Sequence, residues 1–244
     1  MEKDTQIFGL RAIIEAINAN STIDKVFLQK GLKGELFQEL EFAIKKNGVN
    51  ASYVPIEKLN KLTTNNHQGA VAQISPITFH DLETLVENTI ASGATPLFLL
   101  LDQISDVRNF GAIIRTAECT GVNGIIVQKK GGAPVNGDAI KTSAGAVFKI
   151  PICKVDHIKD AMFYMQASGI KVIAATEKTD NTIYDISLKE PCAIIMGSEG
   201  RGINPSVLKL VDAKAKLPLL GDIESLNVSV ACGVFLYEVL RQRL

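Results

Sequence analysis

KLPLLGDIESLNVSVACGVFLYEVLRQRL, which spans residues 216–244, passes from a short apolar strand through a polar bend into one long helix. Gly221 and Asp222 interrupt the apolar run, and from Asn227 onward apolar residues recur at helical spacing. Ser225 and Asn227 are therefore expected at the helix N-terminus. Such residues either cap the free N–H groups or leave them to hold an electron-rich ligand atom. The pattern by itself favours an ordinary cap.

Two upstream stretches change that expectation. Residues 194–202, IIMGSEGRG, read as an apolar strand followed by a loop with three glycines. Such a composition is expected where the backbone approaches a ligand closely. Residues 99–102, LLLD, are a second apolar strand, followed by a loop that turns into a helix carrying Asn109 and Arg115. The two strand ends and the polar bend together predict a site.

These stretches resemble a known family. NFGAIIRTA (109–117), IMGSEGRGI (195–203) and LPLLGDIESLNVSVA (217–231) are similar, in this order, to the three motifs of the SpoU/TrmH-type ribose 2′-O-methyltransferases of the SPOUT superfamily. The match spans Leu97–Leu244. The resemblance implies an α/β domain with a parallel sheet and a carboxy-terminal trefoil knot. Pattern alone argues against a knot, because chains rarely thread their own loops.

The resemblance also implies site residues and a cofactor. S-adenosyl-L-methionine is the expected methyl donor, and no metal is expected. The polar positions around the acceptor ribose, expected to be catalytic, are Asn109, Arg115, Glu199, Ser225 and Asn227. The positions expected to bind the donor are Thr176, Met196, Gly197, Gly200, Leu217, Leu219 and Leu226. Apolar side chains with nearby backbone groups suit an adenine ring.

Arg115 has three interpretations. A proposal attached to the family makes it the general base, although a guanidinium normally stays charged. A charged Arg115 instead clamps a phosphate and stabilises the developing 2′-alkoxide, with Glu199 orienting it. The third interpretation is a structural Arg115–Glu199 ion pair. Arg115 and Asn109 share a helix, and both are expected to point toward the same edge of the site.

The amino-terminal part predicts a smaller α/β unit. An apolar helical face begins at Ile7, and residues 53–56 and 69–74 read as strands. IFGLRAIIEAI, KVFLQKG and HQGAVAQI resemble, more weakly, the small substrate-binding domain of some family members. We expect an RNA substrate-binding domain at 1–76, a linker and leading helix at 77–96, and the SPOUT methyltransferase domain at 97–244.

The remaining pattern predicts a parallel α/β sheet. Expected strands lie at 97–101, 124–127, 171–175, 193–196 and 213–219, with helices at 79–91, 109–120, 138–144 and 156–168 between or before them. The final helix is apolar on more faces than one core contact requires, which predicts burial against a second subunit. The resemblance implies the same homodimer through the carboxy-terminal domain.

Composition constrains the partners. The 26 basic and 26 acidic residues cancel, so an RNA-binding surface requires local segregation of charge. Candidate RNA contacts are Arg108, Lys129, Lys130 and Lys141. The four cysteines show no C-x-x-C pairing and are expected to be buried thiols of a reducing compartment. With no apolar run long enough to span a membrane, the chain is expected to be cytoplasmic.

Other chemistries lack their usual motifs. The GSEGRG loop lacks the first G-x-G of a dinucleotide site, and no Walker lysine loop, zinc spacing or Ser-His pairing is present. Methyl transfer needs none of these motifs, because the donor brings its own reactivity. The resemblance implies RNA ribose 2′-O-methylation as the activity. Ribosomal RNA is favoured because the amino-terminal extension resembles the branch that modifies a guanosine of large-subunit (23S) RNA. A tRNA methyltransferase and a non-catalytic ribosome-assembly factor are the alternatives.

Overall fold

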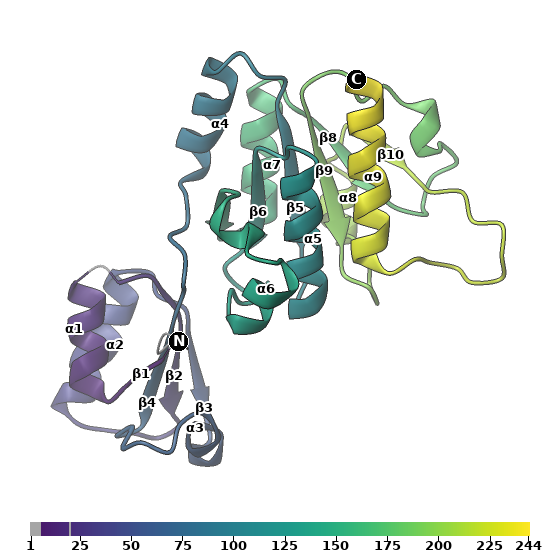
Figure 1. The fold of residues 1–244 in the computed structure, drawn as a ribbon. Helices are drawn as coiled ribbons and strands as arrows, with labels where there is room; N and C mark the ends of the chain where they lie inside the picture. The colour runs from purple at the N-terminus through teal and green to yellow at the C-terminus, as the bar shows by residue number, and fades with distance from the viewer. Residues whose placement is uncertain (1–5, 20) are drawn as a thin grey trace. The chain divides into compact units, whose positions relative to one another are not determined.

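The computed structural model describes residues 6–19 and 21–244, which form two compact units. The first unit comprises the described residues up to Thr78 together with Pro134–Asn136, and the second comprises Phe79–Ala133 and Gly137–Leu244. Figure 1 shows the helices and strands of both units. No helix within the described residues combines the length and the apolar character needed to cross a membrane.

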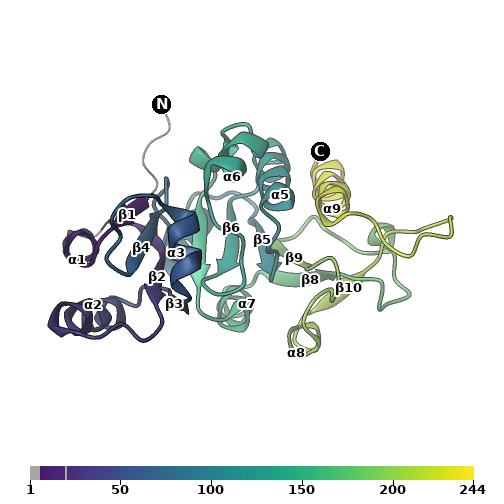
Figure 2. The same cartoon turned by 90° about the horizontal axis from the view of Figure 1, so that it is seen from below.

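The first unit is a four-stranded sheet with helices on both faces. Its sheet order is β1-β4-β2-β3, in which β2 and β3 run parallel and the other pairs run antiparallel. Helices α1 and α2 lie on one face and α3 lies on the other (Figure 2). In chain order the elements are β1 (Gln6–Phe8), α1 (Leu10–Asn18), β2 (Ile23–Gln29), α2 (Glu35–Lys46), β3 (Ala51–Val54), α3 (Ile56–Leu62) and β4 (Ala70–Ile74).

Two local expectations for this unit are wrong. Ile7 lies in β1 rather than on the first helix, because Gly9, with φ at 92°, breaks the chain between strand and helix. Ile56 begins α3 rather than ending a strand. Pro55 precedes it with φ at −60° and serves as the N-cap position of that helix. Periodicity could not separate these short elements.

The second unit is built on a six-stranded sheet, and every pairing in it is parallel, as predicted. The sheet order is β10-β8-β9-β5-β6-β7. Helices α4, α7 and α8 pack on one face, and α5, α6 and α9 lie on the other (Figure 2). In chain order the elements are α4 (Leu82–Ala91), β5 (Leu97–Asp102), α5 (Val107–Cys119), β6 (Gly124–Gln128), α6 (Gly137–Thr142), η1 (Ala146–Phe148), β7 (Ile152–Val155), α7 (Ile158–Ala167), β8 (Lys171–Ala175), η2 (Ile183–Asp185), β9 (Cys192–Gly197), α8 (Pro205–Leu208), β10 (Ala213–Ala215) and α9 (Val228–Arg243).

The structure differs from the expectation in three places. The edge strand β7 was not predicted, because its four residues carry too little pattern to be told from a loop. Helix α4 begins at Leu82 rather than at residue 79, because the side chain of Asp81 caps it by accepting from the Thr84 N–H. Residues 216–219 extend beyond β10, which ends at Ala215.

The cysteines follow the prediction with one exception. Cys153, Cys192 and Cys232 are buried, and burial raises the pKa of Cys153 and of Cys232 to about 12. Cys119 is exposed, which corrects the expectation of four buried thiols. It is the last residue of α5 and lies on a different face of the helix from Ala117, which is buried.

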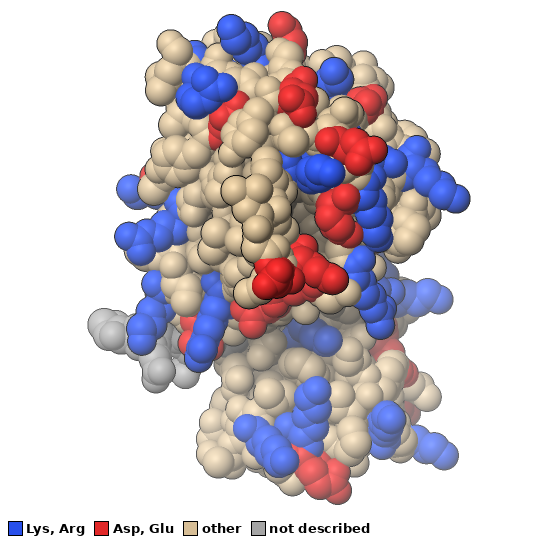
Figure 3. All heavy atoms as spheres, turned by 90° about the vertical axis from the view of Figure 1, so that its right-hand side faces the viewer, with Lys and Arg blue, Asp and Glu red and all other residues tan. Residues whose placement is uncertain are grey.

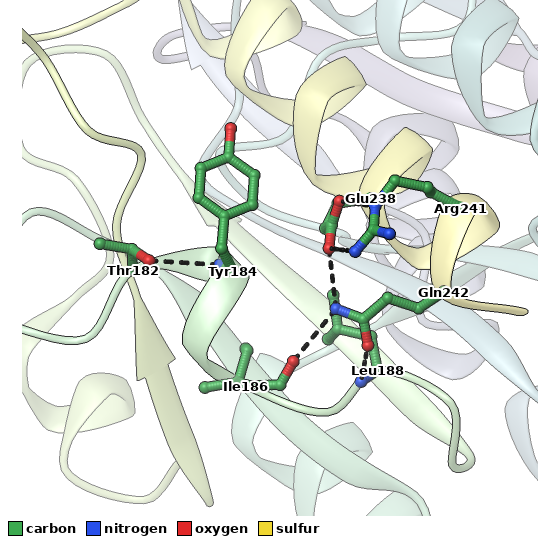
Figure 4. A network of polar contacts seen from close by, with 7 residues as sticks. All are labelled: Thr182, Tyr184, Ile186, Leu188, Glu238, Arg241 and Gln242. Atoms are coloured by element: carbon green, nitrogen blue, oxygen red, sulfur yellow. Dashed lines mark hydrogen bonds and ion pairs between the residues drawn. The ribbon is translucent and has the colours of Figure 1, made fainter.

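The end of α9 is fastened to the loop that carries η2 (Figure 4). Gln242 donates to the Ile186 carbonyl and accepts from the Leu188 N–H, at 3.1 and 2.8 Å. Arg243 donates to four backbone carbonyls in the segments that precede β5 and β9, those of Thr95, Pro96, Leu188 and Glu190. The last turn of α9 thereby fixes the segments that lead into the two central strands, β5 and β9.

Arg243→Ala is expected to lower the free energy of unfolding by about 3 kcal/mol, because Arg243 donates to four backbone carbonyls and hydrogen bonds from a charged donor contribute more than neutral ones. Arg243→Lys should have an intermediate effect. Its ammonium keeps the charge, but it lacks the planar fork of donors with which the guanidinium reaches both segments. Urea denaturation measures the difference. Equal stability of the wild type and Arg243→Ala would contradict this role.

Candidate active site

Three segments far apart in the sequence meet in one polar cluster. Asn109 from α5 donates from Nδ2 to Oε1 of Glu199, which follows β9, at 2.8 Å. Asn227, at the start of α9, donates from Nδ2 to the same Glu199 oxygen at 2.8 Å and to Oδ1 of Asn109 at 3.0 Å. Two predicted residues, Asn109 and Asn227, thus hold the carboxylate of a third, Glu199. The remaining polar atoms of the three residues can accept from or donate to a hydroxyl-bearing ligand.

Capping positions two of the three side chains. The carboxylate of Asp106 caps α5 by accepting from the backbone N–H of Asn109 at 2.8 Å. Oδ1 of Asn227 caps α9 by accepting from the N–H groups of Ser229 and Val230. Capping and ligand-site roles had been set out as alternatives for Asn227. Its oxygen performs the first, while its amide nitrogen belongs to the polar cluster.

Arg115 lies apart from the polar cluster. Its side chain is exposed, and within the described residues it forms neither a hydrogen bond nor an ion pair with Glu199. Six residues of α-helix rotate a side chain by about 600°, so Arg115 points about 120° away from Asn109 around the axis of α5. It shares its exposed stripe with Arg108, seven residues earlier. The expectation of a common edge therefore does not hold within a single chain.

A cavity of about 400 Å³ adjoins the polar cluster. Glu199 belongs to both, and Ser225 lines the cavity from the loop before α9. All seven residues expected to bind the donor also line it: Thr176, Met196, Gly197, Gly200, Leu217, Leu219 and Leu226. A volume of this size lies within the range typical of small-molecule sites.

The glycine loop is shaped by close backbone approach. A Cβ atom on Gly197 would lie 2.1 Å from both the carbonyl carbon of Gly202 and the nitrogen of Ile203. Ser198 and Gly202 exchange two backbone hydrogen bonds, at 3.2 and 2.8 Å, which close the loop into a tight hairpin. The intervening residues Glu199–Arg201 are thereby held at the cavity wall.

Asp102 supports this loop and was not identified from the sequence. It is 1% exposed at the end of β5, and its carboxylate accepts from the backbone N–H of Asn204 at 2.7 Å. Burial raises the pKa of Asp102, and the hydrogen bond from Asn204 opposes that shift. An acidic residue directly after an apolar strand was the available signal.

Asp102→Ala is expected to lower the free energy of unfolding by about 1–3 kcal/mol, because the Asn204 N–H loses its acceptor. Asp102→Asn keeps an acceptor oxygen and removes the buried charge. Because the folded-state pKa of Asp102 is raised, wild type should lose stability relative to Asp102→Asn as the pH rises above about 3.9, the ordinary pKa of this group. Unfolding curves from pH 3 to 7 test both statements.

Helix α9 supplies a further wall of the cavity. Val228, Ala231 and Phe235 line it from one helical face. Its rim also carries charged residues of both signs, namely Glu177, Lys178, Arg201, Lys216 and Glu224. Basic and acidic side chains are intermixed on the face shown in Figure 3, in keeping with the balanced composition.

The four candidate RNA contacts are all exposed in the second unit. Arg108 stands in the first turn of α5, and Lys141 near the end of α6. Lys129 and Lys130 follow β6 directly. Lys129 donates to Asp156 at 2.9 Å, so part of its charge is already neutralised. Arg108, Lys129 and Lys130 lie beyond the carboxyl ends of parallel strands, the edge where such sheets bind ligands.

Two protein-family models match the chain. Residues 96–237 match the SpoU rRNA Methylase family, and residues 6–80 match the domain described as RNA 2′-O ribose methyltransferase substrate binding. A Bacillus subtilis protein, YacO, assigned by name to the TrmH family of tRNA/rRNA methyltransferases, is 33% identical over 97% of this chain and 95% of its own length.

Solved structures share the fold. An AdoMet-bound rRNA methyltransferase from Sinorhizobium meliloti is 24% identical, with a TM-score of 0.62 over 98% of this chain and 88% of its own. The A. aeolicus TrmH/SpoU tRNA modifying enzyme is 27% identical, with a TM-score of 0.56 over 66% of this chain and 84% of its own.

Proposed function

We propose, since this chain belongs to the SpoU rRNA methylase family, that it transfers a methyl group from S-adenosylmethionine to a ribose 2′-hydroxyl in RNA. The observation that carries the proposal is the position of Glu199, which belongs to the polar cluster and also lines the cavity. Donor and acceptor would therefore meet at one carboxylate. Family membership also implies the carboxy-terminal trefoil knot, which includes the segment around Leu217–Asn227.

The cavity walls fit the donor. Leu217, Leu219 and Leu226 offer apolar surface for an adenine ring, and the backbone at Gly197 and Gly200 is free of Cβ atoms at the wall. Thr176 and Met196 complete the set. The bound sulfonium supplies an electrophilic methyl group, so the chain's own task is to hold the acceptor in line and exclude competing orientations.

The polar cluster would position the acceptor. With the donor bound, the 2′-oxygen would form a bond to the methyl carbon as the carbon–sulfur bond breaks, and the hydroxyl proton would pass to solvent water. Asn109, Glu199 and Asn227 present amide and carboxylate atoms that can orient that hydroxyl, with Ser225 beside them at the cavity wall. A charged Arg115 is assigned to the neighbouring phosphate and the developing negative charge on the 2′-oxygen.

A two-fold dimer would bring Arg115 into this arrangement. In a single chain Arg115 is exposed and lies away from the polar cluster. Val230, Val234 and Tyr237 form an apolar stripe on the outer face of α9, with exposed fractions of 53%, 37% and 55%. Such a stripe suits burial against a second copy. We infer that the copies pair through this stripe and α5, so that Arg115 of one copy serves the polar cluster of the other.

The family and the first unit support an RNA substrate. The family description names rRNA, and the amino-terminal match is to a substrate-binding domain. We favour ribosomal RNA, with a guanosine of the large-subunit RNA as the target, acting in the cytoplasm. Arg108, Lys129, Lys130 and Lys141 are assigned to phosphates. A tRNA substrate is the alternative, since the name of YacO gives tRNA beside rRNA.

The proposal predicts saturable binding of S-adenosylmethionine and of its demethylated product in calorimetry. It also predicts transfer of labelled methyl groups from the donor to RNA, with the label resistant to base removal and located on ribose. Ribosomal RNA and tRNA from cells lacking the protein serve as parallel substrates. A folded protein that binds neither donor nor product at millimolar concentration would refute the donor site. Binding without transfer to either RNA would favour a non-catalytic assembly factor.

A further inference from the structure

One face of the amino-terminal sheet is only partly covered. Helices α1 and α2 bury one face, whereas the seven-residue helix α3 packs on the other over Phe27, Val54 and Val71 (Figure 2). Phe8 of β1 lies on this second face, because its neighbour Ile7 belongs to the core under α1 and α2. Phe8 is 39% exposed. A large aromatic side chain is thus presented at the edge of a buried sheet.

Strand register arranges this second face into two rows. Phe8 pairs with Val71, and Val71 pairs with Phe27, which gives an apolar row across three strands. Gln6 pairs with Gln73, and Gln73 pairs with Lys25, which gives a polar row beside it. Residues paired across neighbouring strands share a face and stand about 5 Å apart. An aromatic ring, two amides and an ammonium group therefore lie within reach of one small ligand.

Positive charge is concentrated on the same face. Lys25 and Lys58, from β2 and α3, place Nζ 5.3 and 5.6 Å from the centre of the Phe27 ring. Within the described residues no carboxylate forms an ion pair with either lysine. The ring contact leaves the N–H donors of both ammonium groups available to another partner.

The opposite side of this unit has a different character. Helix α2 carries Glu35, Glu39 and Glu41, and Arg11 of α1 forms an ion pair with Glu39 at 3.7 Å. Its own lysines, Lys45 and Lys46, stand in the last turn, beside the negative end of the helix dipole. Phe42 is also exposed on this side, but it stands on the same helix as these three glutamates. On the α3 side, two lysines stand at the Phe27 ring, and neither forms an ion pair within the described residues.

The chemistry of this face fits an unpaired nucleotide. An exposed aromatic ring stacks on a base, amides bond to base edges, and ammonium groups bond to phosphates. Bases within a duplex are already stacked and offer no free plane to Phe8. We propose that the face formed by Gln6, Phe8, Lys25, Lys58 and Gln73 binds unpaired nucleotides of the substrate RNA. The proposal rests on the function proposed above.

The test uses the full chain and two matched sets of variants. Phe8→Leu and the double variant Lys25→Gln/Lys58→Gln change the proposed face. Phe42→Leu, at a ring 67% exposed on α2, and Lys45→Gln/Lys46→Gln change the opposite side. Leucine keeps apolar bulk at Phe8, so the fold should persist, and thermal unfolding verifies this. The probes are a short unstructured RNA of mixed sequence and a duplex of equal length, and the readout is anisotropy at several salt concentrations.

Phe8→Leu should weaken binding of the unstructured RNA by at least about fivefold, the lower end expected when one base loses its stacking partner. The double lysine variant should reduce the salt slope by about 1.4, because each phosphate contact on a single strand contributes about 0.7. The control variants should bind the unstructured RNA as the wild type does. The affinity for the duplex should be the same in both sets of variants.

Equal binding by both sets, in folded proteins, would overturn the proposed face. So would an equal loss of duplex binding in the Phe8→Leu variant. Donor binding and methyl transfer by the wild type are measured in parallel. If the wild type neither binds the donor nor transfers methyl groups, the proposed function is wrong. If the wild type is active but the Phe8, Lys25 and Lys58 variants bind RNA as it does, only the proposed RNA-binding face is wrong.

Discussion

Arg115→Ala is expected to reduce the rate of methyl transfer by about 10²–10³-fold, the loss typical when one group that stabilises a developing negative charge is removed. Affinity for S-adenosylmethionine should stay nearly unchanged, because Arg115 does not line the cavity. Single-turnover transfer and calorimetry measure the two quantities separately. Arg108→Ala is the matched control on the same exposed stripe of α5, and it should raise the KM for RNA with little effect on the maximal rate.

Mixing two inactive variants tests whether Arg115 acts across subunits. Arg115→Ala and Glu199→Gln should each be inactive as pure proteins. In a randomly mixed population about one quarter of all sites would combine an intact Arg115 from one copy with an intact Glu199 from the other, so about a quarter of wild-type activity should return. Unfolding and refolding the variants together allows the exchange.

The mixed sample also separates the alternatives. If Arg115 served the polar cluster of its own chain, mixed dimers would instead carry both defects on separate sites, and no activity would return. If the protein sediments as a monomer at the assay concentration, the proposed dimer is wrong. Full activity of pure Arg115→Ala would assign Arg115 no part in the reaction.

Gly197→Ala is expected to abolish donor binding and to lower the free energy of unfolding by about 3 kcal/mol or more, as overpacking against an unyielding neighbour does. The added Cβ would lie 2.1 Å from the Gly202 carbonyl carbon and the Ile203 nitrogen. Both atoms are backbone, so no side-chain rotation relieves the contact. The hairpin between Ser198 and Gly202 would have to open, and the cavity wall that carries Glu199 would move with it.

Gly200→Ala is the matched control for stability. It lies in the same loop, and a Cβ there meets no atom within 4 Å. Its unfolding midpoint in urea should therefore stay near that of the wild type. If both variants unfold together with the wild type, the close approach at Gly197 does not constrain the loop.

Local patterns determined much of this protein. Continuous apolar runs predicted the central strands, because parallel strands are buried on both faces. Helical spacing after Asn227 predicted α9. The family resemblance carried by three motifs in order implied which side chains surround the cavity, and those expected to bind the donor do line it. Each of these patterns can be recognised within a short stretch of the sequence.

Only the tertiary structure decided which of those residues touch. Asn109 and Glu199 are 90 residues apart, and Asn109 and Asn227 are 118 apart, so no local pattern could join them at one carboxylate. The burial of Asp102 and the separation of Arg115 from the polar cluster depend in the same way on packing. Periodicity records which face of an element is apolar, but the partner of a polar side chain is set by the elements that fold against it.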